Sequence, residues 1–173
     1  RSAPALVPDD STLGGCMLPS PKNDEKRFAA LSDSGLREFA EAEINFALTG
    51  IHDELAERAR SSEGGRAYAR DEVAFLLTRA RLLQRFAKPQ RGIIIGDALF
   101  SKPAILAPFA FDERSCLRDI FEAAFPTPYI DQYRSASQAT GVPTPLLLAI
   151  TRTESYFDPN ARSTKDARGL MQL

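Results

Sequence analysis

The sequence has few of the residues on which metal sites and nucleophilic sites are built. It contains one histidine, His52, and two cysteines, Cys16 and Cys116. His52 stands in a charged segment without a second histidine or a cysteine nearby. Neither a metal site nor a Ser/His/Asp triad can therefore be assigned to it. We expect the protein to use no metal and no cofactor.

The cysteine spacing fits neither a zinc site nor a CxxC redox motif. We expect two separate thiols, with a Cys16–Cys116 disulfide as the alternative.

The sequence also lacks an excess of charge and a long apolar run. Its 22 basic and 23 acidic residues give a formal charge of −1. The net charge therefore provides no general electrostatic attraction to nucleic acid. The arginines of residues 66–87 are accompanied by acidic residues, which favours a solvated face over a nucleic-acid surface. No run reaches the roughly 18 apolar residues of a transmembrane helix. The chain begins with Arg1 and contains no secretory apolar region, which does not imply a cytosolic protein.

Apolar spacing and helix breakers predict an all-α fold. Residues 1–23 are rich in proline and read as an extended lead-in. Residues 24–124 form a helical scaffold of paired helices, with a superhelical array as a hypothesis. The Pro-rich segment 101–111 connects two parts of it. Helices are predicted over about 32–48, 51–60, 66–87, 92–100, 112–124 and 130–140, with stops at Gly50, Pro89 and Gly141.

A further helix is predicted from Thr144, as N-cap, and Pro145 to Ser155. Leu147, Ile150 and Glu154 lie on one face of it, so the acid continues an apolar stripe. We expect apolar surroundings and the helix C-terminus to disfavour the charged form of a carboxylate at this position. A general acid that works near neutral pH must be protonated before it reacts. The alternative is an ordinary solvated carboxylate at a helix end.

Turn residues and small residues follow this helix. Ser163–Asp166 has the form of a capping box. Gly169 lets a ligand approach the backbone, and Gln172 can donate to and accept from hydroxyl or acetamido groups. Ser163 as a cap and Met171 as a core residue are the structural alternatives.

The last part of the chain contains two motifs, Ile150-x-Arg152-x-Glu154-Ser155-x-Phe157-x-Pro159-x-Ala161-x-Ser163 and Ala167-x-Gly169-Leu170-Met171-Gln172-Leu173. Together they closely resemble the opening of the catalytic domain of the soluble lytic transglycosylases. These are bacterial cell-wall enzymes with a lysozyme-like domain. Residues 125–129 and 141–143 also resemble the approach to that domain. We therefore expect the catalytic domain to begin at residue 125 and to occupy 125–173.

The resemblance implies catalysis by a single acid, Glu154. It would protonate the glycosidic oxygen between N-acetylmuramic acid and N-acetylglucosamine, and then act as base on the muramoyl 6-hydroxyl. Attack by that hydroxyl replaces the second carboxylate that most glycosidases need.

The resemblance also implies peptidoglycan strands as substrate and the periplasm or cell envelope as location. The substrate-binding residues it implies are Ser163, Met171 and Gln172, and the supporting residues are Ser155, Phe157 and Gly169.

Two departures from the family pattern affect this expectation. Asp166 stands where the family usually has glycine, which alters the loop or adds a charge. The chain stops at Leu173, within the expected domain, so we expect weak or no activity from it alone. A lysozyme-type muramidase that uses water is one alternative. An inert helical scaffold or peptidoglycan-binding module is another.

Overall fold

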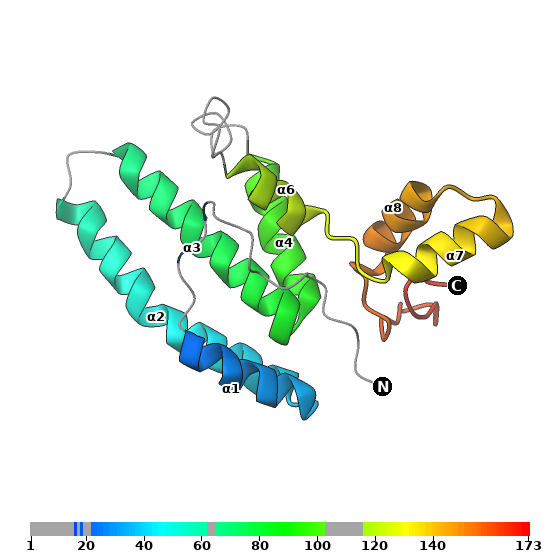
Figure 1. Cartoon of the computed structure of the whole chain (residues 1–173), viewed down its shortest axis with the longest axis horizontal. Coiled ribbons are helices and arrows are strands. Elements are labelled where there is room, and N and C mark those ends of the chain that lie inside the picture. The colour runs from blue at the N-terminus through cyan, green and yellow to red at the C-terminus, as the bar shows by residue number, and fades with distance from the viewer. Residues whose placement is uncertain (1–15, 17, 19–21, 62–64, 103–115) are drawn as a thin grey trace.

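The computed structural model describes Cys16, Leu18 and residues 22–61, 65–102 and 116–173. Over these residues the chain forms seven helices and no strand, which confirms the all-α prediction (Figure 1). A layer of five helices is followed by a smaller unit of two helices and a terminal loop. The helices are α1 (Lys22–Asp33), α2 (Arg37–Ser61), α3 (Gly65–Phe86), α4 (Pro89–Phe100), α6 (Leu117–Ala124), α7 (Ile130–Thr140) and α8 (Thr144–Ser155).

The first two helix boundaries differ from the prediction. Residues 32–34 end α1 instead of starting a helix, because Gly35 adopts a left-handed conformation with φ 77°. The amides of Gly35 and Leu36 donate to the carbonyls of Ser32 and Leu31, which is a Schellman ending. Gly50 does not stop α2, since Leu48 and Leu55 on either side of it remain buried. Continuous packing therefore outweighs the low helix propensity of one glycine.

Helix α4 is confirmed close to its predicted place, and Pro89 begins it instead of ending α3. Two glycines let α4 pack closely between its neighbours. A Cβ atom at Gly92 would collide with the carbonyl oxygen of Ala80 in α3. A Cβ at Gly96 would lie 2.5 Å from backbone atoms of Ala123 and Ala124 in α6. The predicted connection 101–111 and the start of the predicted helix 112–124 fall mostly outside the described residues.

The helical layer has two apolar clusters. One joins α1, α2 and α3 around Phe28, Ile44 and Leu83. The other joins α3, α4 and α6 around Leu77, Leu99 and Ile120 and includes both cysteines.

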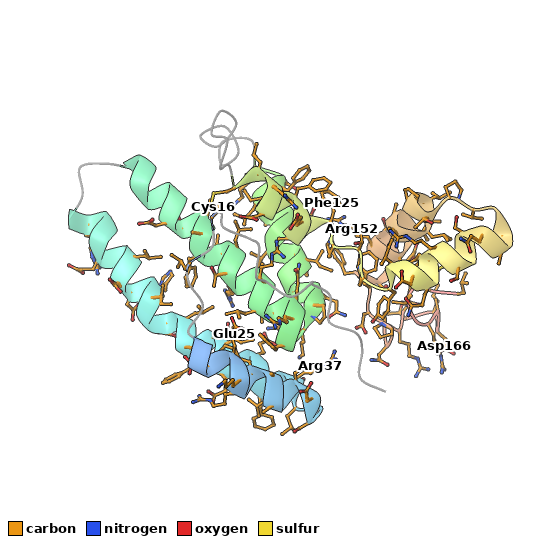
Figure 2. The ribbon with its side chains drawn as sticks, in the orientation of Figure 1. Cys16, Glu25, Arg37, Phe125, Arg152 and Asp166 are labelled. Carbon is orange, nitrogen blue, oxygen red and sulfur yellow. A yellow bond between two sulfur atoms is a disulfide. The ribbon has the colours of Figure 1, made fainter. Side chains whose placement is uncertain are left out.

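Cys16 and Cys116 form a disulfide, so the prediction of two separate thiols is wrong. Their Cα atoms lie 5.1 Å apart, within the range that disulfides require. The Cys16 amide also donates to the buried Asp119 carboxylate at 3.1 Å, and the Leu18 amide to the Thr78 hydroxyl at 2.9 Å. Figure 2 shows Cys16 beside α6. Spacing along the chain could not show that Cys16 lies next to Cys116 in the fold.

Arg81 of α3 is another correction to the expected solvated face. It donates to Glu122 of α6 at 2.9 Å, and its side chain is only 11% exposed. Burial acts to raise the pKa of Glu122, but hydrogen bonds from Arg118 and Arg81 hold that pKa below its usual value. This arginine therefore joins two helices.

The smaller unit contains α7, α8 and residues 156–173. Gly141 ends α7 with φ 74°, as predicted, whereas the N-cap of α8 is Pro143 and Thr144 is already helical. Its core contains Tyr133, Leu147 and Phe157 together with Ile93 of α4. None of the described helices is both long and apolar enough to cross a membrane.

Candidate functional site

Glu154 lies in the last turn of α8 and is exposed. The predicted apolar stripe is buried only in part: Leu147 is 9% exposed, but Ile150 is 36% exposed. Tyr133 of α7 covers α8 as far as Thr151, to which its hydroxyl donates at 2.8 Å. The prediction that Glu154 lies against buried apolar surface is therefore wrong. Helical spacing shows which residues share a face, but not how far the neighbouring helix covers it.

Burial also raises the pKa of Tyr133, although the hydrogen bond to Thr151 acts to lower it. The phenol therefore remains a neutral donor to Thr151, whose own hydroxyl donates to the Leu147 carbonyl at 3.0 Å. This buried chain of hydrogen bonds holds α7 and α8 together next to the candidate acid.

The chain reverses direction directly after Glu154 and Ser155. Tyr156 and Phe157 both adopt left-handed backbone conformations, with φ of 48° and 63°. Such conformations cost L-residues about 1–2 kcal/mol each. Phe157 offsets this cost by packing into the core, where it is 3% exposed. Backbone strain that is held in place by packing is typical of functional sites.

Ser155 connects the two sequence motifs. Its hydroxyl hydrogen-bonds the Leu170 carbonyl at 2.8 Å and lies 3.2 Å from the Thr151 carbonyl. The segment 169–172 is thereby held against the last turn of α8, beside Glu154. Gly169 adopts φ 73°, and its amide donates to the Ala161 carbonyl at 2.8 Å. The structure thus brings Ser155, Gly169 and the candidate acid into one region.

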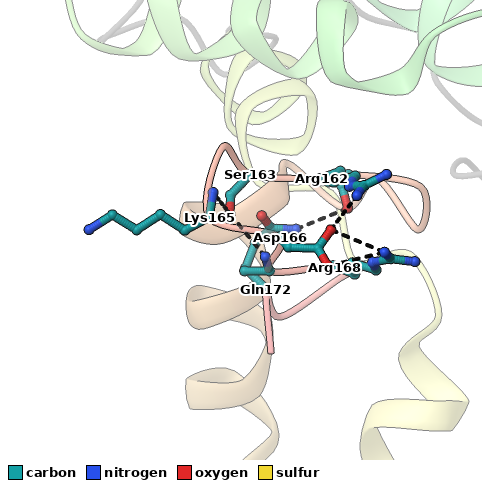
Figure 3. A network of polar contacts seen from close by, with 8 residues as sticks. Arg162, Ser163, Lys165, Asp166, Arg168 and Gln172 are labelled. Atoms are coloured by element: carbon teal, nitrogen blue, oxygen red, sulfur yellow. Dashed lines mark hydrogen bonds and ion pairs between the residues drawn. The ribbon is translucent and has the colours of Figure 1, made fainter.

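Ser163 and Gln172 shape the terminal loop (Figure 3). The Ser163 hydroxyl accepts from the amides of Lys165 and Ala167 at 3.2 and 3.0 Å. The Gln172 amide donates to the carbonyls of Ala161 and Gly169 at 3.2 and 2.9 Å. No helix follows Ser163, so the capping-box prediction is wrong and its hydroxyl closes a turn instead. Met171 is half-buried against the core of the smaller unit.

Asp166 adds a charge to this loop, as its departure from the family pattern predicted. It adopts φ 68°, a conformation that glycine favours. Its carboxylate pairs with Arg162 at 2.5 Å and with Arg168 at 3.0 Å. Figure 3 shows both arginines converging on it. The loop therefore keeps the backbone that glycine would allow and gains an ionic cluster.

Arg152 is a residue whose role the sequence did not predict. It lies two positions from Glu154 along the helix, which makes it no evident salt-bridge partner of that acid, and in the fold it pairs with Asp97 of α4 at 2.6 Å. Asp158, by contrast, accepts from the Asn160 amide at 2.9 Å, which is turn chemistry. Among the described residues the motif region therefore offers one candidate acid, Glu154, at the end of a helix tied to α4.

Comparison with known proteins shows what this part of the chain is similar to. Residues 131–173, which comprise all but the first residue of α7, together with α8 and the terminal loop, match the family described as Transglycosylase SLT domain. The helices before residue 131 lie outside this match.

Named proteins are similar to a segment of the chain as well. A protein called membrane-bound lytic murein transglycosylase C from Edwardsiella ictaluri is 53% identical over 45 residues. Proteins of the same name from Sodalis glossinidius and Serratia proteamaculans are 53% and 51% identical over 45 residues. Each alignment covers 26% of this chain and 12–13% of the relative. No solved structure matches the chain significantly.

Proposed function

We propose that the chain carries the first part of the catalytic domain of a peptidoglycan lytic transglycosylase, with Glu154 as its acid and base. The match of residues 131–173 to the SLT domain family is the observation that carries this proposal. The hydrogen bond from Ser155 to the Leu170 carbonyl supports it, because this bond joins the two halves of the motif beside the acid.

The proposed reaction proceeds in two proton transfers. Glu154, protonated, donates its proton to the glycosidic oxygen between N-acetylmuramic acid and N-acetylglucosamine as the bond to the anomeric carbon breaks. The carboxylate then removes the proton of the muramoyl 6-hydroxyl, whose oxygen forms the new bond to that carbon. The products are a 1,6-anhydromuramoyl end and a free N-acetylglucosamine 4-hydroxyl. A positioned acid of this kind contributes about 10²- to 10⁴-fold to the rate.

We infer that the terminal loop forms part of the glycan-binding surface. Ser163 and Gln172 set the shape of the loop, since their side chains bond to its backbone. Met171 lies beside Gln172 in the segment that Ser155 holds against α8. In this proposal Phe157 and Gly169 act indirectly, by packing under the loop and by providing its left-handed turn.

The proposed location is the periplasm or cell envelope, where peptidoglycan is accessible. The names of the relatives support the envelope. The Cys16–Cys116 disulfide supports an oxidising compartment, because cytosolic proteins of most bacteria keep their thiols reduced.

The test is digestion of purified peptidoglycan by the full native polypeptide and by two variants, with product masses read by mass spectrometry. We expect 1,6-anhydromuramoyl ends, a loss of about 10²-fold or more with Glu154→Gln, and no change with Glu72→Gln, an exposed acid of α3. Hydrated ends, heavier by one water, would indicate a muramidase instead. Wall binding without turnover in all three proteins would indicate a binding module and contradict the proposal.

A further inference from the structure

Helix α4 presents separate faces to the two parts of the molecule. Gly92 and Gly96 lie against the backbones of α3 and α6. Ile93 and Asp97, each one position further along, contact the smaller unit: Ile93 packs with Leu147 and Phe157, and Asp97 pairs with Arg152. Since residues four apart share a helix face, this arrangement repeats over a full turn. One helix therefore connects the helical layer to the segment that carries the candidate acid.

Arg152 is held by three different groups of the layer. Its Nε donates to the carbonyl of Ala124, at the C-terminus of α6, at 3.1 Å. One terminal nitrogen donates to Asp97 at 2.6 Å. Its guanidinium also lies 4.6 Å from the centre of the Phe125 ring. We call these contacts of Arg152 with Asp97, Ala124 and Phe125 the docking contact (Figure 2).

The docking contact is more than an ordinary surface ion pair. The side chains of Arg152 and Asp97 are 20% and 34% exposed, so solvent screens their attraction only in part. The two hydrogen bonds use the planar shape of the guanidinium, and its face is stacked on an aromatic ring. The Ala124 carbonyl is one of the α6 C-terminal groups that have no partner within their own helix. These contacts fix the direction in which the Arg152 side chain points as well as its distance from α4 and α6.

Arg152 and Glu154 point in nearly opposite directions. Residues two positions apart on an α-helix are separated by about 200° around its axis. When the docking contact holds the Arg152 side of α8 against α4 and α6, Glu154 is turned away from the layer, which agrees with its exposure. The Tyr133–Thr151 hydrogen bond holds another side of α8 from within the SLT match. The rotation of α8 about its own axis, and with it the direction of the acid, is thus set in part by residues outside that match.

We propose that Arg152 is a positioning residue that fixes the orientation of Glu154 by docking α8 on α4 and α6. Asp97 of the helical layer is then a positioning residue as well, because it provides the other half of the contact. The consequence for catalysis rests on the proposed function above, whereas the docking itself does not.

The docking is tested first without catalysis, by hydrogen exchange of the full native polypeptide and three variants. Asp97→Asn and Arg152→Gln each remove the ion pair; the first keeps the size of the side chain, and the second replaces the guanidinium by a shorter, neutral amide. We expect amides of α8 to exchange about tenfold faster in both, the effect of losing a charge-assisted hydrogen bond. Arg134→Gln is the matched control, because Arg134 pairs with Asp131 within α7 at 3.4 Å without bridging to the layer. We expect no change in α8 with this variant.

Kinetics then separate a positioning role from general destabilisation. Misplacing the acid lowers kcat, and we expect a roughly 10- to 100-fold loss with little change in KM for Asp97→Asn and Arg152→Gln. The double variant should be no slower than Arg152→Gln, because both substitutions break one contact. Arg152→Lys should recover only part of the rate, since lysine keeps the charge but not the two-directional geometry.

Unchanged exchange of α8 in Asp97→Asn would overturn the docking, whatever the enzyme does. Losses in kcat that multiply in the double variant, or equal losses with Arg134→Gln, would overturn the positioning role. Failure of the proposed function is recognised separately, by a Glu154→Gln variant that keeps full turnover while the exchange results hold.

Discussion

At the scale of single residues, Asp166 occupies a backbone conformation that most residues avoid. Its φ of 68° is open to glycine, asparagine and aspartate, but poorly accessible to β-branched side chains. All five described non-glycine residues with positive φ lie between Tyr129 and Gln172. These left-handed conformations are thus concentrated in the smaller unit that carries the motif and in Tyr129, the residue directly before it.

Substitution of Asp166 should separate backbone strain from ion pairing. We expect Asp166→Gly to change the free energy of unfolding by less than about 1 kcal/mol, because it loses only exposed ion pairs. Asp166→Val loses the same pairs and adds strain, so we expect it to be less stable than the glycine variant by about 1–3 kcal/mol. Chemical denaturation measures both. Equal stability of the two variants would show that the left-handed conformation is not maintained.

The residue types around the site were predictable, but their contacts were not. Ser163 and Gln172 were expected to bind substrate, and the fold uses both side chains in bonds to the loop backbone. Their role in substrate binding stays a prediction. A polar side chain in a motif shows that hydrogen bonding occurs, whereas the partner depends on a loop path that local propensity does not specify.

At the scale of helices, α4 owes its central position to two small residues. Gly92 and Gly96 are spaced four apart, so both lie on one side of the helix. Their missing side chains allow backbone contact with α3 and α6. Asp97 follows directly and thus lies near the end of α6, where the Ala124 carbonyl also meets Arg152.

A matched pair of alanine substitutions tests this arrangement. Gly96→Ala would place a Cβ 2.5 Å from the backbone of α6, and overpacking of this kind typically costs about 1–3 kcal/mol. Gly50→Ala lies in a helix interior, and apart from its chain neighbours and the backbone of its own helix nothing lies within 4 Å of the added Cβ. We therefore expect a gain of about 0.5–1 kcal/mol from helix propensity. Thermal unfolding of both variants measures the difference. Stabilisation by Gly96→Ala would contradict the close crossing of α4 and α6.

Helix boundaries were predictable where they depend on the local chain. Gly141 ends α7, and Pro145 stands in the first turn of α8, as predicted. Pro89, which was predicted to end α3, begins α4 instead. The single helix across Gly50 was missed, because tertiary packing of Leu48 and Leu55 decides it. Local signals specify where a helix can end, and burial decides whether it does.

At the scale of the whole molecule, the disulfide ties the beginning of the chain to α6. Cys16 and Cys116 are separated by 100 positions, so the bond restricts a large part of the unfolded chain. Cys116 is fully buried. Hydrogen bonds from the amides of Cys16 and Leu18 hold the same segment over α6 and α3.

Loss of the disulfide should therefore destabilise the helical layer. For a loop of this length we expect about 3–5 kcal/mol less stability in the double variant Cys16→Ser and Cys116→Ser. The native protein should show a lower Tm after treatment with a reducing agent under unfolding conditions, and the double variant should not respond to it. If reduction left the Tm of the native protein unchanged, and the double variant unfolded at the same Tm as the native protein, the bond would not constrain the chain.

The amino-acid sequence by itself determined the all-α class, most helix positions and the motif around Glu154. These depend on apolar periodicity, on turn residues and on spacing within one short segment, all of which are local. Only the tertiary structure decided that Glu154 is exposed, that Cys16 meets Cys116 and that Arg152 pairs with Asp97. Each of these depends on which distant segments pack together, because burial and ion pairing follow from proximity in space, which spacing along the chain does not specify.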